Sequence, residues 1–277
     1  MSRIAQCFAS LRARDEAALV AFFTCGDPDL ATTRELVRAA VSEGADLIEL
    51  GVPFSDPMAD GPTLQRAAGR ALSGGTSLHR VLELVTELRG DVDVPIVLFG
   101  YYNPFFRYGH AALARDAAAA GADGFLCVDL PPEEGGDFRS AVRAAGLDLI
   151  FLLAPTSGPA RIRTVARAAS GFVYFVSVLG VTGARTELPP DLPELVRDVR
   201  QVTDLPVGVG FGVSTPEQAA WLAGFADAVI VGSAFARIVE ESERAEAPAR
   251  VAEFTGSLRR AMRAARSRGA AFSPGKS

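Results

Sequence analysis

The stretch LPVGVGFGVSTPEQAAWLAGFADAVIVGSA, residues 205–234, contains the unit from which most of the chain is built. An apolar run (Leu205–Gly210) leads into a helical pattern (Thr215–Ala223) that stops at Gly224, and a second apolar run (Asp227–Val231) follows. Continuous apolar runs are typical of parallel strands buried on both faces. A glycine just past a helix suits a left-handed cap. The stretch therefore predicts a strand–helix–strand unit of a parallel sheet.

Six further apolar runs precede this stretch. They are Ala17–Phe23, Ala45–Leu50, Val94–Phe99, Asp123–Val128, Leu147–Leu153 and Phe172–Val176. Helical patterns between the runs again stop at glycines: Thr32–Glu43 at Gly44, Ala111–Ala120 at Gly121, and Glu133–Ala145 at Gly146. Eight such strands in a chain of 277 residues predict a single (β/α)₈ TIM barrel. An open doubly wound sheet is disfavoured because no GxGxxG motif follows the first run.

Extra helices are expected at both ends of the barrel. Ile4–Ala13 precedes the first strand and is expected to plug the barrel floor, and Glu243–Ser267 reads as one or two final helices. The basic stretch RRAMRAARSR (residues 259–268) is expected to form a solvated helix face. Because no linker marks a second domain, we expect one catalytic barrel domain over residues 1–268 and a disordered tail over residues 269–277.

Composition excludes several classes of protein. A net charge of −5 argues against a nucleic-acid binder. Cys7, Cys25 and Cys127 form neither a disulfide framework nor a zinc pattern, residues 1–16 lack a secretory apolar region, and no apolar run approaches the ~18 residues of a membrane helix. We therefore expect a cytoplasmic protein. The sole lysine, Lys276, lies in the tail, so Schiff-base chemistry has no lysine inside a pocket.

The loops after the last three strands predict a phosphate site. TIM barrels place active sites at the C-terminal ends of their strands and commonly bind phosphate between loops seven and eight. Here Gly212 follows the seventh run, and Gly232 and Ser233 open a helix after the eighth, where backbone N–H groups can approach an anion. Thr182 and Gly183, in the long loop after the sixth run, are expected to complete the cradle.

The second run and its following loop carry the candidate catalytic carboxylates. Glu49 interrupts a buried run, and strand alternation places it on the same face as Leu47. A carboxylate inside a barrel is unfavourable unless it is paired, protonated or catalytic, so a paired core glutamate is the alternative. Asp56 and Asp60 precede turn-forming residues, but Asp60 lies in the loop that leaves the strand of Glu49, so the two can divide acid and base roles. Tyr101, after the third run, is expected to line the mouth.

The remaining chemically versatile side chains are expected to be structural. His79 and His110 lie on helices away from strand ends and form no metal set or catalytic triad. Trp221 and Met58 are expected to be packing residues.

Seven segments, in order over almost the whole chain, resemble the alpha subunit of tryptophan synthase. They are FTCGDPD (Phe23–Asp29), ELGVPFSDPMADGP (Glu49–Pro62), GYYNP (Gly100–Pro104), VDLPPEE (Val128–Glu134), GVTGAR (Gly180–Arg185), GFGVSTPEQ (Gly210–Gln218) and VGSA (Val231–Ala234). The second segment is highly specific to that family.

The resemblance implies a retro-aldol cleavage of indole-3-glycerol phosphate to indole and glyceraldehyde 3-phosphate, without a cofactor or a metal. Glu49 would protonate the indole ring carbon and take up the glycerol hydroxyl proton, and Asp60 would hydrogen-bond the indole N–H. Tyr174 would touch the substrate and help to position the glutamate. The other implied substrate-binding positions are Phe22, Phe99 and Phe211 around the indole and Gly183, Gly212, Gly232 and Ser233 around the phosphate.

The resemblance also implies a partner, the pyridoxal-phosphate beta subunit, in an alpha₂beta₂ tetramer contacted near Asp56 and Pro57. Two alternatives stay open: a stand-alone indole-3-glycerol phosphate lyase of specialised metabolism, and an inactive homologue that only activates a beta subunit. Retention of Glu49 and Asp60 disfavours the inactive homologue. The missing pocket lysine and metal ligands disfavour other phosphosugar barrels.

Overall fold

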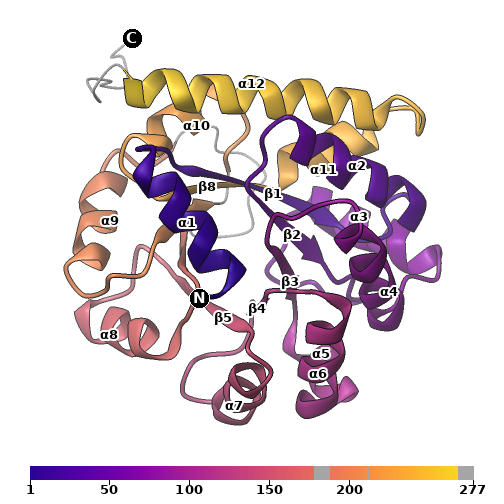
Figure 1. Ribbon diagram of the computed structural model, residues 1–277, viewed down its shortest axis with the longest axis horizontal. Coiled ribbons are helices and arrows are strands. Elements are labelled where there is room, and N and C mark those ends of the chain that lie inside the picture. The colour runs from indigo at the N-terminus through magenta and orange to yellow at the C-terminus, as the bar shows by residue number, and fades with distance from the viewer. Residues whose placement is uncertain (178–187, 211, 268–277) are drawn as a thin grey trace.

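A computed structural model describes residues 1–177, 188–210 and 212–267 of the chain. Eight parallel strands close into a barrel in the order β1 to β8, so the predicted TIM barrel is confirmed (Figure 1). The strands are β1 (Ala18–Thr24), β2 (Leu47–Gly51), β3 (Ile96–Gly100), β4 (Gly124–Cys127), β5 (Asp148–Leu153), β6 (Val173–Val176), β7 (Val207–Gly210) and β8 (Ala228–Val231). Each lies within two residues of a predicted run.

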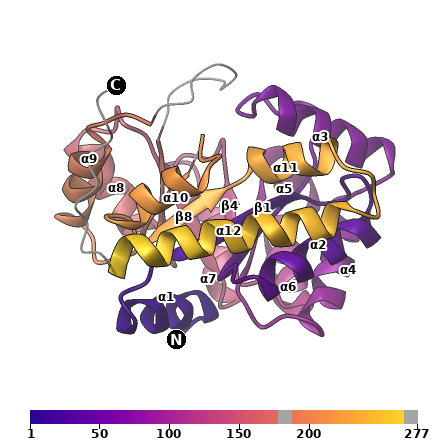
Figure 2. The same cartoon turned by 90° about the horizontal axis from the view of Figure 1, so that it is seen from above.

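Helices surround the barrel, with α1 beneath one end of it and α12 along its flank (Figure 2). They are α1 (Arg3–Ala13), α2 (Leu30–Ser42), α3 (Pro62–Ser73), α4 (Leu78–Arg89), α5 (Tyr102–Tyr108), α6 (His110–Ala120), α7 (Gly136–Ala144), α8 (Pro159–Ala168), α9 (Leu192–Arg200), α10 (Pro216–Ala223), α11 (Ser233–Glu240) and α12 (Ala247–Ser267). Within the described ranges, none of these helices is long and apolar enough to cross a membrane.

Three details of the predicted helices were wrong. Helix α12 begins at Ala247 rather than at Glu243, because the amide of Glu246 first closes a turn onto Glu243. Helix α7 begins at Gly136 rather than at Glu133, because the amide of Gly135 closes a turn onto Pro131 first. Gly224 has φ −65°, so it is right-handed and not the expected left-handed cap. The left-handed conformation is present at Gly44, Gly121 and Gly146, as their places before a strand predicted.

Apolar side chains form two layers, one inside the barrel and one between the strands and the helices. In β2, Leu47 belongs to the inner layer, whereas Ile48 and Leu50 face the helices. Strand alternation then places Glu49 inside the barrel, as predicted. Glu49 is therefore an acidic residue of β2 that lies within an apolar inner layer.

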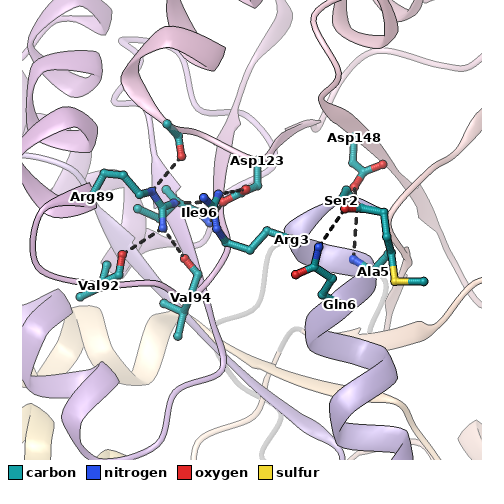
Figure 3. Close-up of polar contacts among 12 residues, drawn as sticks. Ser2, Arg3, Ala5, Gln6, Arg89, Val92, Val94, Ile96, Asp123 and Asp148 are labelled. Carbon is teal, nitrogen blue, oxygen red and sulfur yellow. Dashed lines mark hydrogen bonds and ion pairs between the residues drawn. The ribbon is translucent and has the colours of Figure 1, made fainter.

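Helix α1 closes the N-terminal end of the barrel, which confirms the predicted plug. Ile4, Phe8 and Leu11 join the inner apolar layer. Two polar contacts fasten the start of the helix: Ser2 Oγ donates to Asp148 Oδ2 (2.7 Å), and Arg3 pairs with Asp123 (Figure 3). Because this end is filled, a ligand must enter the barrel from the opposite end.

Helix α12 corrects the prediction of a solvated basic face. Arg259 is only 5 % exposed, and its guanidinium donates to Glu16 Oε2 (2.8 Å) and the carbonyl of Ala17 (3.0 Å) and pairs with Asp46 (3.0 Å). Arg266 also reaches back, to Asp15 (2.7 Å). The basic stretch therefore ties the last helix to the segments that enter β1 and β2.

The division into a barrel domain over residues 1–268 and a tail stays a prediction. The tail over residues 269–277, with Lys276, lies outside the described residues.

Candidate active site

The predicted site residues gather at the C-terminal ends of neighbouring strands. Phe22 on β1 is the register partner of Glu49 on β2, and Phe99 on β3 is the partner of Gly51. Phe22, Phe99 and Tyr174 of β6 all belong to the inner apolar layer. The barrel thus brings together residues that are separated by as many as 152 positions, from Phe22 to Tyr174.

Glu49 lies in a buried, apolar environment. Its side chain is 1 % exposed, and within the described residues Oε1 has no hydrogen-bond partner. Burial raises the pKa of Glu49 to about 8, because the apolar interior disfavours the charged form. At neutral pH the group is therefore mostly protonated and can act as an acid.

Asp60 has a more polar environment. Tyr101 donates its hydroxyl hydrogen to Asp60 Oδ2 (3.1 Å) and accepts a hydrogen bond from the amide of Ala59 (3.0 Å). Burial raises the pKa of Asp60 to about 6, although the hydrogen bond from Tyr101 opposes that shift. At neutral pH Asp60 is therefore mostly ionised while Glu49 is not, which is the division that acid–base chemistry requires.

Sequence reasoning missed the role of Tyr101 as the partner of Asp60. It expected Tyr101 to line the mouth of the barrel, and the tyrosine, which is 6 % exposed, lines the pocket that contains Asp60. The available signal was its position as the first residue after β3, beside the loop that follows β2.

An apolar pocket lies next to Asp60, between the ends of β1, β2 and β3. The Phe22 and Phe99 rings meet edge to face at 5.1 Å, and Phe54 packs on Tyr101 at 5.4 Å. The other lining residues are Thr24, Gly51, Val52, Pro53, Pro57, Asp60, Leu64, Ala68 and Gly100. Aromatic walls and one carboxylate are the groups that would recognise a flat ring carrying a hydrogen-bond donor.

Tyr174 approaches the two carboxylates from the other side of the barrel. The ring is 4 % exposed. Burial, and after it the charges of Glu49 and Asp60, raise the pKa of Tyr174 above its usual range, as expected for groups that share one low-dielectric site. The hydroxyl lies against Gly210 at the end of β7, where an added Cβ would meet it at 2.1 Å.

The predicted anion site lies at the N-termini of helices α10 and α11, and these differ in how many of their amides are already hydrogen-bonded. Helix α10 satisfies its own N-terminus, because Gln218 accepts from the amides of Ser214 (2.8 Å) and Thr215 (3.3 Å), and Thr215 accepts from the amide of Gln218 (3.3 Å). Helix α11 has no such cap, since its N-cap residue is Gly232 and no side chain bonds to its first amides. The amides at Ser233 and beyond are therefore the better donors for an anion.

Gly212, another residue of the predicted anion site, has a backbone conformation that favours glycine. Its φ is +81°. It carries the chain from β7 toward the start of α10. Thr182, Gly183 and Phe211, three further predicted substrate contacts, lie outside the described residues.

The loop after β2 is exposed where a partner contact was predicted. Asp56 is exposed and accepts from Ser55 Oγ (2.5 Å), and Pro57 is half-buried. Met58 is 83 % exposed, so its interpretation as a packing residue was wrong. The loop is held by the turn that closes from the amide of Asp60 to Pro57 (3.1 Å) and leaves the methionine outside.

The residues expected to be structural have structural contacts. His110 forms a hydrogen bond with the Tyr102 hydroxyl (3.0 Å), and the ring of His79 lies 4.6 Å from that of Tyr108. Trp221 packs on Phe225 at 5.0 Å. In the described part of the chain, no three His, Cys, Asp or Glu side chains are grouped to hold a metal ion.

Comparisons with known proteins identify relatives over almost the whole chain. The family model "Tryptophan synthase alpha chain" matches residues 8–265. The tryptophan synthase alpha chain of Citrifermentans bemidjiense is 55 % identical over 95 % of this chain and 98 % of its own, and that of Geobacter sulfurreducens is 53 % identical over 95 % and 99 %.

Solved structures give the same result. A chain of Mycobacterium tuberculosis tryptophan synthase has a TM-score of 0.87 at 42 % identity and covers 95 % of this chain and 98 % of its own. Tryptophan synthase subunit alpha of Legionella pneumophila has a TM-score of 0.88 at 37 % identity and covers 95 % and 99 %.

We predict that Gly210→Ala displaces Tyr174, because the new methyl group would lie 2.1 Å from the hydroxyl oxygen and 2.6 Å from Cζ. The expected result is a loss of about 1–3 kcal/mol in the free energy of unfolding, measured by urea denaturation.

The double variant Gly210→Ala/Tyr174→Leu provides the control, because leucine is too short to occupy the position of the Tyr174 hydroxyl, where the new methyl group lies. It should recover part of the lost stability. Additive losses in the double variant would show that the two positions do not compete for space.

Proposed function

The chain belongs to the tryptophan synthase alpha chain family, and on this premise we propose that Glu49 and Asp60 are the groups that carry out its reaction. The enzyme is a carbon–carbon lyase that cleaves indole-3-glycerol phosphate to indole and glyceraldehyde 3-phosphate, the alpha reaction of tryptophan biosynthesis. The observation that carries the assignment is the environment of Glu49, which is buried inside the barrel with an unbonded carboxyl oxygen and no described ion pair.

The two carboxyl groups have distinct parts in the reaction. Protonated Glu49 transfers its proton to the indole carbon that bears the glycerol chain, while ionised Asp60 accepts a hydrogen bond from the ring N–H and stabilises the positive charge of the resulting protonated indolenine. The Glu49 carboxylate then removes the proton of the adjacent glycerol hydroxyl. The carbon–carbon bond breaks, its electron pair returns to the ring, and the aldehyde leaves. The pKa order of the two groups, about 8 for Glu49 and about 6 for Asp60, supports this assignment.

The remaining contacts fix the substrate at both ends. Phe22 and Phe99 would bracket the indole, with Tyr101 fixing Asp60 and Tyr174 standing beside the two carboxylates. The uncapped start of α11, with Gly232 and Ser233, would hold the phosphate together with Gly212. Phe211, Thr182 and Gly183 stay proposed contacts on the strength of the sequence alone.

A tryptophan synthase beta chain is the proposed partner, in an alpha₂beta₂ tetramer. The exposed loop with Asp56, Pro57 and Met58 supports a contact near the site, because methionine is enriched at protein interfaces and Met58 is exposed. The cytoplasmic location likewise stays a proposal, supported by the unpaired Cys7, Cys25 and Cys127.

Indole release from indole-3-glycerol phosphate is the direct test, with the full chain assayed alone and with the beta chain of the same organism. Stimulation by the beta chain is expected for the biosynthetic enzyme. High turnover of the isolated chain without stimulation would favour a stand-alone lyase, and no turnover in either assay would favour the inactive homologue.

The pH dependence of kcat/KM should be bell-shaped. The reactive form of the free enzyme has Asp60 ionised and Glu49 protonated, so kcat/KM should rise through about pH 6 and fall through about pH 8. Asp60→Asn should remove the rise on the acid side. An acid limb that persists in Asp60→Asn would contradict the assignment of that limb.

Glu49→Gln should lower kcat by roughly 10²–10⁴-fold while the Kd of substrate changes by only a few-fold. Stability provides the control for folding. The wild-type carboxyl has a raised pKa in the folded state, so folding favours its protonated form. Its contribution to the free energy of unfolding is complete below about pH 4.5 and is lost as the pH rises through about 8. Gln does not titrate, so the variant should gain stability relative to wild type over that range. Near-normal turnover in the variant would refute the role of Glu49.

Gly212→Val should weaken the binding of glycerol 3-phosphate by at least about tenfold in calorimetry, because a side chain blocks close approach of the backbone and strains a φ of +81°. Gly75→Val is the matched control: its φ is +77°, and no atom lies within 4 Å of an added Cβ. Both variants should lose stability, but only the first should lose affinity. Equal affinities would remove Gly212 from the phosphate site.

A further inference from the structure

Two helices lead away from the two ends of the proposed substrate site. Helix α3 begins two residues after Asp60, and helix α11 begins at Ser233, where the phosphate would bind. The two helices pack against each other on the same flank of the barrel (Figures 1 and 2). Their relative placement therefore sets the distance between the carboxylate at one end of the site and the anion-binding amides at the other.

A buried carboxylate that the proposed mechanism does not use lies beside these helices. Asp27, in the loop after β1, is only 3 % exposed. Arg70 of α3 donates to both of its oxygens, with Nε 2.7 Å from Oδ1 and Nη2 2.9 Å from Oδ2. Such a two-pronged contact fixes direction as well as distance.

The same guanidinium also reaches the second helix. Arg70 Nη1 donates to Glu240 Oε1 (2.9 Å), in the last turn of α11. We call Asp27, Arg70 and Glu240 the Arg70 bridge. It joins the loop after β1, helix α3 and helix α11 through one side chain.

The loop that carries Asp27 is itself held against α3. Gly26 has φ +88°, and an added Cβ there would lie 1.9 Å from Oγ1 of Thr76, three residues past the end of α3. The amide of Gly26 also donates to Thr33 Oγ1 (3.0 Å). Asp27 is therefore a firm anchor for Arg70, and the bridge has a rigid end on the barrel.

We propose that Arg70 is a positioning residue that holds α3 and α11 in register, so that Asp60 and the phosphate-binding amides stay at the spacing the substrate requires. The inference rests on the proposed function. Arg70 itself touches neither reacting group. It acts because a substrate held at both ends reacts only when the two ends are correctly spaced, and errors of about 1 Å can lower rates by about 10².

Arg70→Met is the principal test, with Arg66→Met as the matched control. Arg66 lies one turn earlier on α3 and pairs with the same Glu240 (2.7 Å), but its side chain is 55 % exposed and it has no described contact with Asp27. Each full-length variant is assayed for indole release, for the Kd of glycerol 3-phosphate by calorimetry, and for folding by circular dichroism.

Arg70→Met is expected to lower kcat by about tenfold or more, while the Kd of glycerol 3-phosphate, which occupies only the phosphate end, stays within about threefold. Arg66→Met should leave both quantities within about threefold, because exposed ion pairs contribute little. A merely structural role would lower the melting temperature of Arg70→Met but leave the kcat of the folded enzyme unchanged. Arg70→Lys, which cannot make both forked contacts, should recover kcat only in part.

Glu240→Gln is the second variant, because it keeps the buried Arg70–Asp27 pair and so keeps the fold. It should lower kcat in the same direction as Arg70→Met. If Arg70→Met and Glu240→Gln both keep wild-type kcat, or lose kcat and glycerol phosphate affinity together, the positioning role is wrong. A wild-type chain that releases no indole would instead overturn the proposed function, and the role of Arg70 with it.

Discussion

The central constraint of this structure is the burial of one carboxyl group among hydrocarbon side chains. Glu49 lies on the inner face of β2, above the apolar residues that the strands and α1 contribute to the inner layer, and is 1 % exposed. An ion is poorly solvated there, so the group keeps its proton at neutral pH. The closed barrel therefore serves catalysis directly, because the same close packing that stabilises the sheet produces an acid that water would not.

Asp60 can have a different role from Glu49 in acid–base chemistry because the surroundings of the two carboxyl groups differ. Asp60 lies on a loop rather than a strand, and the hydroxyl of Tyr101 faces it. One hydrogen bond and partial exposure keep Asp60 mostly ionised at a pH where Glu49 is neutral. The barrel supplies the apolar position and the loop supplies the polar one, and both belong to one segment because Asp60 lies in the loop that follows the strand of Glu49.

The sequence allowed much of the fold to be predicted, because its signals are local. Apolar runs mark the strands, and alternation within β2 placed Glu49 on the inner face. What failed depends on distant partners. Arg259 looked like part of a solvated face because Glu16, its partner, is 243 positions away. Met58 looked like a packing residue because nothing local shows which way a loop turns. For the same reason, the contact between Tyr101 and Asp60 was not foreseen.

The plug at the barrel floor has a consequence for how the protein is made. Helix α1 leaves the ribosome before its partners, because Phe8 packs on Phe172 at 5.7 Å and Ser2 bonds to Asp148. At about 5–20 residues per second, synthesis takes on the order of ten seconds or more to supply those partners. Until then the apolar face of α1 has no barrel residues to pack against. The helix therefore reaches its buried position only after most of the chain has been synthesised.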